Sequence, residues 1–144
     1  MCSILCYAGK DVTKETMEGY LLKTKMRGPD AQQVVETEFG LTPDGMQPFQ
    51  RDGSWVICNG EIYGFRKIKK ELEERGYQFQ SGSDCEVLLP LYEEYGLEMF
   101  SHLDAEYACV LYDHKSGKLI AARDQIGIRP LFYGYSKSGK IAFA

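Results

Sequence analysis

The chain has 144 residues, 44% of them hydrophobic and 26% charged, which is enough for one hydrophobic core and too few for two independent domains. Its 17 basic and 21 acidic side chains give a net charge of −4 without a basic cluster, which argues against nucleic-acid binding. No apolar run approaches the roughly 20 residues of a membrane span, and no signal-peptide pattern is present. We therefore expect a cytoplasmic protein that does not contact membranes.

The cysteines are odd in number and scattered, and no two of them form a Cys-x-x-Cys pair of the kind found in zinc sites and redox motifs. We expect a reducing compartment in which most thiols are small buried apolar groups. With only His102 and His114 besides, both predicted at the surface, a catalytic metal is not expected. The five cysteines are Cys2, Cys6, Cys58, Cys85 and Cys109.

The first predicted elements are a strand and a helix. Residues 4–8 are apolar enough for a buried strand. Thr13 is a predicted helix N-cap, and the helix after it stops at the turn Gly28-Pro29. Its apolar face consists of Met17, Tyr20, Leu21 and Thr24.

Strand-like runs at residues 33–39 and 55–58 precede two further predicted helices. The earlier helix ends at Gly76 and carries an apolar stripe on one face. The later one begins with a capping-box pattern, Ser83 and Glu86, and ends before Gly96. The apolar stripes are Phe65, Ile68 and Leu72 in the earlier helix, and Val87, Leu88, Leu91, Tyr92 and Tyr95 in the later.

The last third of the chain alternates strands with short turns. Predicted strands at 107–112 and 119–122 flank a turn at 114–117, and those at 131–135 and 141–143 flank a turn at 136–139. Connections this short permit only antiparallel pairing, so the fold class is α+β.

Cys2 stands out because removal of Met1 would make it the N-terminal residue. A terminal cysteine carries its thiol beside a free α-amine whose pKa, near 7.7–8.0, lets that amine act as a general base at neutral pH. Nucleophile and base would then be one residue. The alternative is that Cys2 only begins a buried strand.

Polar residues and glycines gather where the predicted apolar strands and helices begin or end. Asn59-Gly60 follows a strand and offers two donors for an oxyanion hole, or else forms a plain Asn-Gly turn. Asp84 begins a helix, where the helix dipole favours a carboxylate whatever its function. Arg27, in the sequence Arg-Gly-Pro-Asp, can belong to a simple helix stop, and the charged loop 123–131 can hold a structural Arg-Asp pair.

Taken together, these motifs resemble the class II glutamine amidotransferases over nearly the whole chain. They are Cys2, Arg27-Gly28-Pro29-Asp30, Asn59-Gly60-Glu61-Ile62-Tyr63, Gly82-Ser83-Asp84-Cys85-Glu86, and Arg123-Asp124 through Pro130-Leu131. Their wording is most similar to the glutaminase domain of glutamine-hydrolysing asparagine synthetases. The resemblance implies an N-terminal-nucleophile hydrolase fold, a four-layer αββα sandwich of two antiparallel sheets.

The resemblance also implies an activity, the hydrolysis of L-glutamine to glutamate and ammonia. Cys2 would form a γ-glutamyl thioester, while Asn59 and Gly60 would hold the oxyanion. Glu61 and Asp84 would bind the substrate's α-ammonium. Arg27 would stand at the margin of the site, and the 123–131 loop would brace it. The ammonia would pass to a synthetase domain or subunit, the place where ATP and Mg are expected, and a homodimer is possible.

Two features depart from the family pattern. Ser3 replaces the usual glycine after the nucleophile, which requires that the backbone there has no positive φ. The arginine that grips the substrate's α-carboxylate has no counterpart, because Phe39-Gly40 runs directly into residues 41–48. We therefore expect one amidotransferase domain over residues 1–144, truncated at its C-terminus and lacking a substrate loop near 40–46.

Two other functions stay open. The missing arginine is compatible with a noncatalytic or regulatory module that keeps the fold and binds a partner. A different N-terminal-nucleophile hydrolase, acting on an amide such as a γ-glutamyl peptide, also fits the residues.

Overall fold

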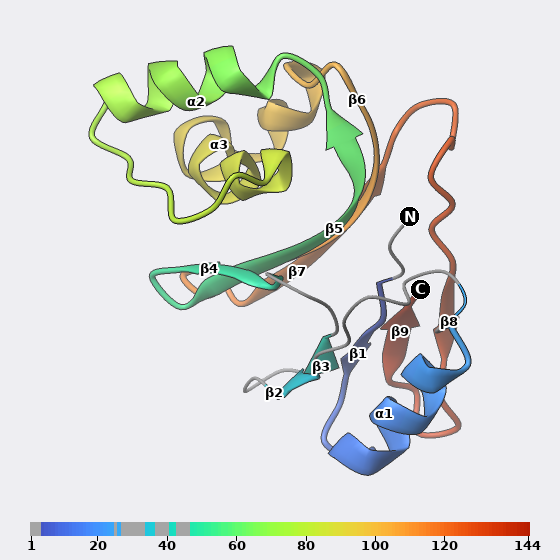
Figure 1. The fold of residues 1–144 in the computed structure, drawn as a ribbon. Coiled ribbons are helices and arrows are strands. Elements are labelled where there is room, and N and C mark those ends of the chain that lie inside the picture. Colours follow the sequence, from blue (N-terminus) through green and yellow to red (C-terminus); the bar gives the residue numbers. More distant parts are fainter. Residues whose placement is uncertain (1–3, 25, 27–33, 37–40, 43–46) are drawn as a thin grey trace.

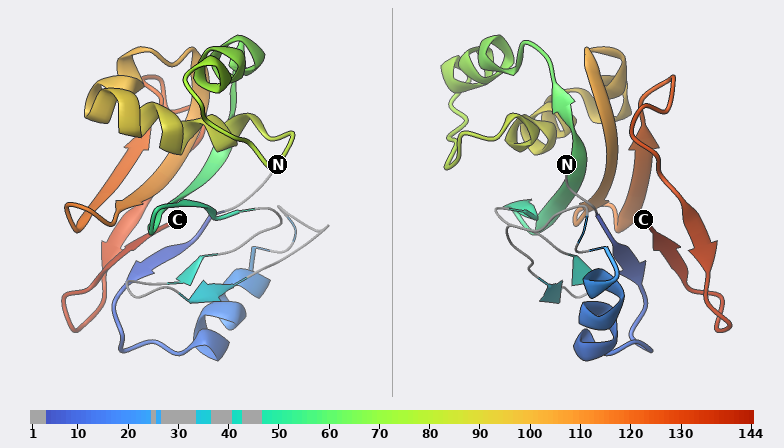
Figure 2. Two further views of the ribbon diagram at one scale, coloured as in Figure 1. Left: turned by 90° about the vertical axis from the view of Figure 1, so that its left-hand side faces the viewer. Right: turned by 45° about the vertical axis from the view of Figure 1, so that its right-hand side comes forward.

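The chain folds into two antiparallel sheets that face each other, with helices on both outer sides (Figure 1). The computed structural model describes residues 4–24, 26, 34–36, 41–42 and 47–144. The described elements confirm the predicted α+β class, and they follow the order helix, sheet, sheet, helix seen in the two views of Figure 2.

The first sheet has the strand order β2-β3-β1-β9-β8. Its centre is β1, where Tyr7 lies opposite Leu41 on one side and Ala142 on the other. The predicted terminal hairpin is confirmed, because β8 and β9 pair directly. The strands are β1 (Cys6–Ala8), β2 (Val35–Glu36), β3 (Leu41–Thr42), β8 (Tyr133–Tyr135) and β9 (Ile141–Phe143).

The second sheet has the order β4-β5-β6-β7. Its two long central strands pair over their whole length, with Cys58 opposite Cys109 and Gly60 opposite Tyr107. The outer strand β4 pairs only with the first residues of β5, from Ser54 to Val56. The strands are β4 (Phe49–Arg51), β5 (Ser54–Ile62), β6 (Ala105–Asp113) and β7 (Lys118–Arg123).

The helices divide between the two outer sides of the sandwich. In Figure 1, α1 (Lys14–Leu22) lies beside β1 and β9, and α2 (Phe65–Glu74) and α3 (Leu88–Tyr95) lie over β5 and β6. Two short 3-10 helices, η1 (Asp84–Val87) and η2 (Gly96–Ser101), flank α3.

The alternation of side chains along β5 builds two cores. Val56 and Cys58 face the helices and pack with Leu88 and Met99, among others. Trp55 and Ile57 face the first sheet and pack with Ile4, Cys6, Val110 and Tyr112. Every other residue of β5 therefore belongs to the space between the sheets.

The predicted first helix is correct at its start and too long at its end. The Thr13 hydroxyl accepts a hydrogen bond from the Thr16 N–H, which confirms the N-cap. The helix ends at Leu22, before Gly28-Pro29, which lies outside the described residues. Met17 and Leu21 are buried as predicted, whereas Tyr20 is half exposed and does not belong to the inward face.

The predicted capping box at Ser83 and Glu86 is wrong in one half. Ser83 caps η1 by accepting from the Cys85 N–H. The Glu86 carboxylate does not return to Ser83, because it accepts from the N–H groups of Gln80 and Ser81 and from the Ser81 hydroxyl. Glu86 therefore fixes the segment before the helix.

Candidate functional site

Several predicted site residues lie along the edge of β5 that faces away from β6, in the part of the strand that β4 does not pair with. At Cys58 the backbone N–H donates to Gln47 Oε1 at 2.6 Å, and the carbonyl accepts from Gln47 Nε2 at 2.8 Å. At Ile62 the N–H donates to Asp84 Oδ2 at 2.6 Å. Alternate residues of a strand direct their backbone groups to the same edge, so Gly60 directs its N–H to this edge, between the two contacts.

The side chains of Asn59 and Glu61 project from β5 toward the first sheet, on the same face as Ile57. Asn59 is buried, with 8% of its surface exposed, and Glu61 at the strand end is exposed. The structure therefore places an amide side chain, the Gly60 N–H and a carboxylate on consecutive residues. Such a combination supplies donors for an oxygen atom and an acceptor for a cation.

Gly60 has no space for a side chain. A Cβ atom there would lie 2.4 Å from the Glu106 carbonyl oxygen and 2.7 Å from the Tyr107 Cα. The glycine therefore lets β5 and β6 approach closely where β5 leaves the core. Packing alone accounts for this residue, whether or not its N–H takes part in chemistry.

The predicted partners Glu61 and Asp84 lie at the same strand end. Asp84 begins η1, and its Oδ2 oxygen bonds the N–H of Ile62, the residue next to Glu61. One carboxylate oxygen of Asp84 is therefore committed to holding the strand. The other oxygen, together with the exposed Glu61 carboxylate, provides the negative charge of this edge.

A second carboxylate lies directly opposite Glu61 on the neighbouring strand. Glu106 pairs with Glu61 in register and accepts from Arg129 Nη2 at 2.7 Å. Both members of this ion pair are largely buried, and Arg129 Nε has no hydrogen-bond partner among the described atoms. The Arg129 charge offsets the repulsion between the two glutamates.

The loop after β7 is organised by the buried Asp124. Its carboxylate accepts from the N–H groups of Gly127 at 2.6 Å, Ile128 at 3.0 Å and Arg129 at 3.2 Å, and from that of Tyr107 at 3.3 Å. Burial would raise the pKa of Asp124, but these four backbone donors lower it to about 2. Asp124 therefore binds backbone groups instead of forming the structural Arg-Asp pair considered from the sequence.

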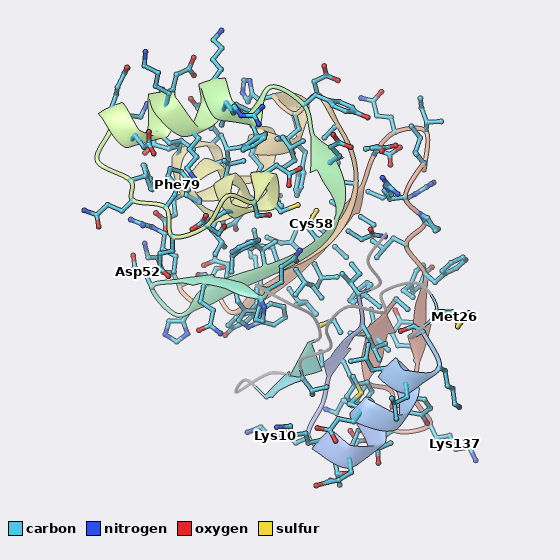
Figure 3. All side chains as sticks on the ribbon, viewed as in Figure 1. Lys10, Met26, Asp52, Cys58, Phe79 and Lys137 are labelled. Atoms are coloured by element: carbon cyan, nitrogen blue, oxygen red, sulfur yellow. The ribbon has the colours of Figure 1, made fainter. Side chains whose placement is uncertain are left out.

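Three buried thiols lie behind β5, on the side of the helices. Cys58, which Figure 3 labels, lies against Cys85 and opposite Cys109 on the neighbouring strand. All three thiols are free. Burial raises the pKa of Cys109 to about 12, and the Cys85 contact and burial raise that of Cys58. The prediction of small buried apolar thiols is confirmed for these residues and for Cys6.

Several predicted features are placed away from this edge or are not described. Cys2, Ser3 and Arg27 lie outside the described residues, as do positions 40 and 43–46 of the segment where a loop is expected. His102 and His114 are exposed, as predicted. A cavity of about 290 Å³ opens between β4 and residues 78–81, and neither the Asn59–Glu61 stretch nor Asp84 lines it.

Sequence reasoning missed Gln47 and the Glu106–Arg129 ion pair. Neither forms a recognisable local pattern, although the register of the strand pairs contains the information. Within the described part of the chain, no cluster of three or more His, Cys, Asp or Glu side chains is arranged as a metal site. No described helix has the length and hydropathy to cross a membrane.

Comparison with known proteins places the chain in a family. The model of the glutamine amidotransferase domain matches residues 1–144. A probable glutamine-hydrolysing asparagine synthetase of Acanthamoeba polyphaga mimivirus is 39% identical, and the match covers all of this chain and 30% of the relative. A glutamine-hydrolysing asparagine synthetase of Zea mays is 43% identical over 69% of this chain and 17% of its own length.

A solved structure supports the fold independently. The glutamine phosphoribosylpyrophosphate amidotransferase of B. subtilis superposes with a TM-score of 0.82 at 19% identity, over 99% of this chain and 41% of that one. The chain thus spans less than a third of the synthetases it matches and less than half of this amidotransferase. From the family match and the two-sheet architecture together, the chain belongs to the glutamine amidotransferase domain family and has the N-terminal-nucleophile fold.

Proposed function

We propose that this domain hydrolyses L-glutamine to glutamate and ammonia, with Cys2 as the nucleophile after removal of Met1. The observation that carries the proposal is the β5 edge, where the Gly60 N–H is directed outward between two anchored residues. Asn59 stands beside it and two acidic side chains lie at the strand end. These groups supply donors for an oxyanion and negative charge for an ammonium, which supports the hydrolysis of an amino-acid amide.

The reaction proceeds through a thioester. The Cys2 sulfur attacks the side-chain amide carbon of glutamine, and the α-amine of the same residue takes the thiol proton and passes it to the leaving ammonia. The Asn59 side-chain amide and the Gly60 N–H stabilise the negative oxygen of the tetrahedral intermediate, roughly 3–4 kcal/mol per donor. Water then attacks the γ-glutamyl thioester, which releases glutamate and restores the thiol.

The substrate's α-ammonium binds between Glu61 and the free carboxylate oxygen of Asp84. The family resemblance assigns Arg27 to the margin of the site. The α-carboxylate lacks the arginine expected near residues 40–46, and its absence predicts weak glutamine binding. The alignment with the mimivirus relative runs over 165 residues, longer than this chain of 144, which supports an additional segment inside that relative.

The ammonia passes to a synthetase domain or subunit, and asparagine synthesis is the reaction that the relatives' names favour. ATP and Mg belong to that acceptor and not to this domain. The protein works in the cytoplasm, where the free buried thiols stay reduced. A homodimer is compatible with this arrangement.

The mass of the purified protein and the activity of Cys2→Ala test the proposal together. We expect the mass to show that Met1 is absent, the wild-type protein to release ammonia from glutamine, and Cys2→Ala to release none while keeping the circular dichroism of the wild type. A retained Met1, or full activity in Cys2→Ala, would refute the nucleophile.

The missing carboxylate-binding arginine favours one other function, a noncatalytic module that keeps the fold and binds a partner. Calorimetric titration of L-glutamine into Cys2→Ala separates the two functions, because this variant binds substrate without consuming it. Millimolar or tighter binding excludes the noncatalytic module, and no binding at tens of millimolar excludes the glutaminase.

A further inference from the structure

We propose that Gln47 is a positioning residue for the hydrolysis, because its side chain holds the β5 edge in the place from which Gly60 presents its N–H. This inference rests on the proposed function and adds a residue to it. Gln47 lies outside the stretch of β5 that carries the donors, and it acts through the backbone of Cys58.

The contact between Gln47 and β5 replaces a missing piece of the sheet. Phe49 pairs with Val56, so the antiparallel register places Gln47 opposite Cys58. The strand β4 begins at Phe49, so the backbone ladder stops before it reaches Cys58. The Gln47 side-chain amide then makes both bonds of a paired residue, accepting from the Cys58 N–H at 2.6 Å and donating to its carbonyl at 2.8 Å.

These bonds matter for the reaction because of where they lie along the strand. Cys58 and Ile62 are two residues before and after Gly60, about 7 Å away in each direction. Gln47 anchors the first and Asp84 the second. The backbone of Asn59 and Gly60 is thereby fixed on its outer edge from both sides, while β6 holds the inner edge.

Loss of the Gln47 amide would leave the N–H and carbonyl of Cys58 without these partners. Cys58 is 1% exposed, so water does not readily replace them, and the strand must shift to find others. A shift at Cys58 moves Gly60, which follows it by two residues. The expected effect therefore falls on stabilisation of the oxyanion and leaves the binding of the α-ammonium at Glu61 and Asp84 largely unchanged.

Gln47→Met tests this inference, because methionine has a similar length and makes neither hydrogen bond. We expect kcat to fall about 10- to 100-fold while KM changes less than about threefold, the pattern of a lost transition-state interaction. L-Glutamate γ-semialdehyde provides a second readout, since its aldehyde forms a hemithioacetal with Cys2 whose oxygen occupies the oxyanion position. Its affinity should fall by the same factor as kcat, and that of L-glutamate should not.

Gln47→Glu gives an independent test, because its carboxylate differs from the amide only in its donor and its charge. When neutral, the introduced carboxylic acid accepts with its carbonyl oxygen and donates with its O–H, so both bonds to Cys58 are kept. When ionised, it has no donor and faces the Cys58 carbonyl with negative charge. At pH 8, where the α-amine works as a base, the carboxylate is ionised. The kcat of Gln47→Glu should therefore fall well below that of the wild type at this pH, with circular dichroism confirming that the variant stays folded.

Ser54→Ala is the matched control. The Ser54 hydroxyl accepts from the His114 N–H at 3.1 Å, so this change also removes a hydrogen bond to β5, at the end far from Gly60. We expect a wild-type kcat and wild-type aldehyde affinity from it.

The outcomes separate this inference from the function on which it rests. A wild-type protein without glutaminase activity overturns both. With an active wild type, the role of Gln47 alone is refuted if folded Gln47→Met keeps kcat within twofold, or if Ser54→Ala loses as much. Should Gln47→Met fail to fold, a folded Gln47→Glu that keeps kcat within twofold of the wild type at pH 8 is the refuting result.

Discussion

Single polar side chains fix the backbone around the end of β5. Gln47, Asp84 and Asp124 each accept a hydrogen bond from the backbone N–H of a residue in another segment. The donors are Cys58, Ile62 and Tyr107, which are 11, 22 and 17 residues away in sequence. A carboxylate that accepts several N–H bonds is stabilised in its charged form. The position of the site backbone is therefore set by individual side chains as much as by the strand ladder.

Asp124→Asn should make stability less dependent on pH in acid. The folded pKa of Asp124 is about 2, below the value of about 3.9 for an unfolded chain, so its contribution is present above pH 4 and is lost as the pH falls through 2. The asparagine side chain has one acceptor oxygen in place of two, so it accepts fewer of the N–H bonds, and it carries no negative charge. The urea midpoint of Asp124→Asn should lie below that of the wild type at pH 7, and the two should converge toward pH 2.

Asp52→Asn is the control for this comparison. Asp52 is exposed in the turn before β5, with a φ of 47° that asparagine also tolerates. Its midpoints should follow the wild type at each pH. If the difference between the urea midpoints of Asp124→Asn and the wild type stays constant from pH 7 to pH 2, the assigned role is contradicted.

The sequence allowed some of these residues to be predicted and not others. Asn59 and Gly60 follow the apolar run 55–58, and Asp84 begins a helix, so local pattern was sufficient to select them. The predicted strand end at Cys58 and the alternative of a plain Asn-Gly turn are wrong, because β5 continues to Ile62 and pairs both residues with β6. The partner of Gln47 lies 11 residues away, and the bond depends on the register of β4 and β5. Tertiary pairing of this kind has no local signature, which is why Gln47 and the Glu106–Arg129 pair were missed.

At the level of elements, the β5–β6 pair is the frame of the site. The antiparallel pair extends from the core, where Cys58 lies opposite Cys109, to its margin, where Glu61 lies opposite Glu106. Helix ends were harder to predict than these strands. The capping pattern at Glu86 could not reveal that its carboxylate would find three donors in the preceding segment, at residues 80 and 81, because those donors depend on the path of the incoming chain.

Gly60→Ala should separate β5 from β6. The added methyl would lie 2.4 Å from the Glu106 carbonyl oxygen, and a backbone atom cannot move away cheaply. We expect a loss of about 1–3 kcal/mol in the free energy of unfolding, the usual range for an overpacked core, and a fall in glutaminase activity. Chemical denaturation monitored by tryptophan fluorescence suits the measurement, since Trp55 is buried in the same strand.

Gly134→Ala is the matched glycine variant. Gly134 also lies in a strand, β8, but a Cβ there meets no described atom within 4 Å and its φ is not positive. Its stability should equal that of the wild type or exceed it slightly, since alanine loses less conformational entropy on folding. Equal losses in the two glycine variants would show that the close approach at Gly60 is not the cause.

At the scale of the whole molecule, the two sheets differ in how completely they are covered. The second sheet is buried beneath α2 and α3 on one face and the first sheet on the other. The first sheet ends in β8 among the described strands, and this strand carries two tyrosines, Tyr133 and Tyr135, that are 71% and 69% exposed. Phe132, directly before it, is also exposed.

This edge should make the 144-residue domain self-associate at high concentration. Phe132 and Ser136 direct their N–H groups to the β9 side, so the intervening Tyr133 and Tyr135 direct theirs outward, beside exposed aromatic rings. Unpaired edge groups flanked by apolar surface favour strand-to-strand association. Tyr135→Lys should keep the fold and lower the sedimentation coefficient at high concentration toward that of a monomer, because lysine on an edge strand opposes pairing. Leu97→Lys is the control, because it replaces a comparably exposed apolar residue in η2, and it should leave the association unchanged. If the wild type stays monomeric at every concentration, or if the two lysine variants have equal effects, β8 is not the contact.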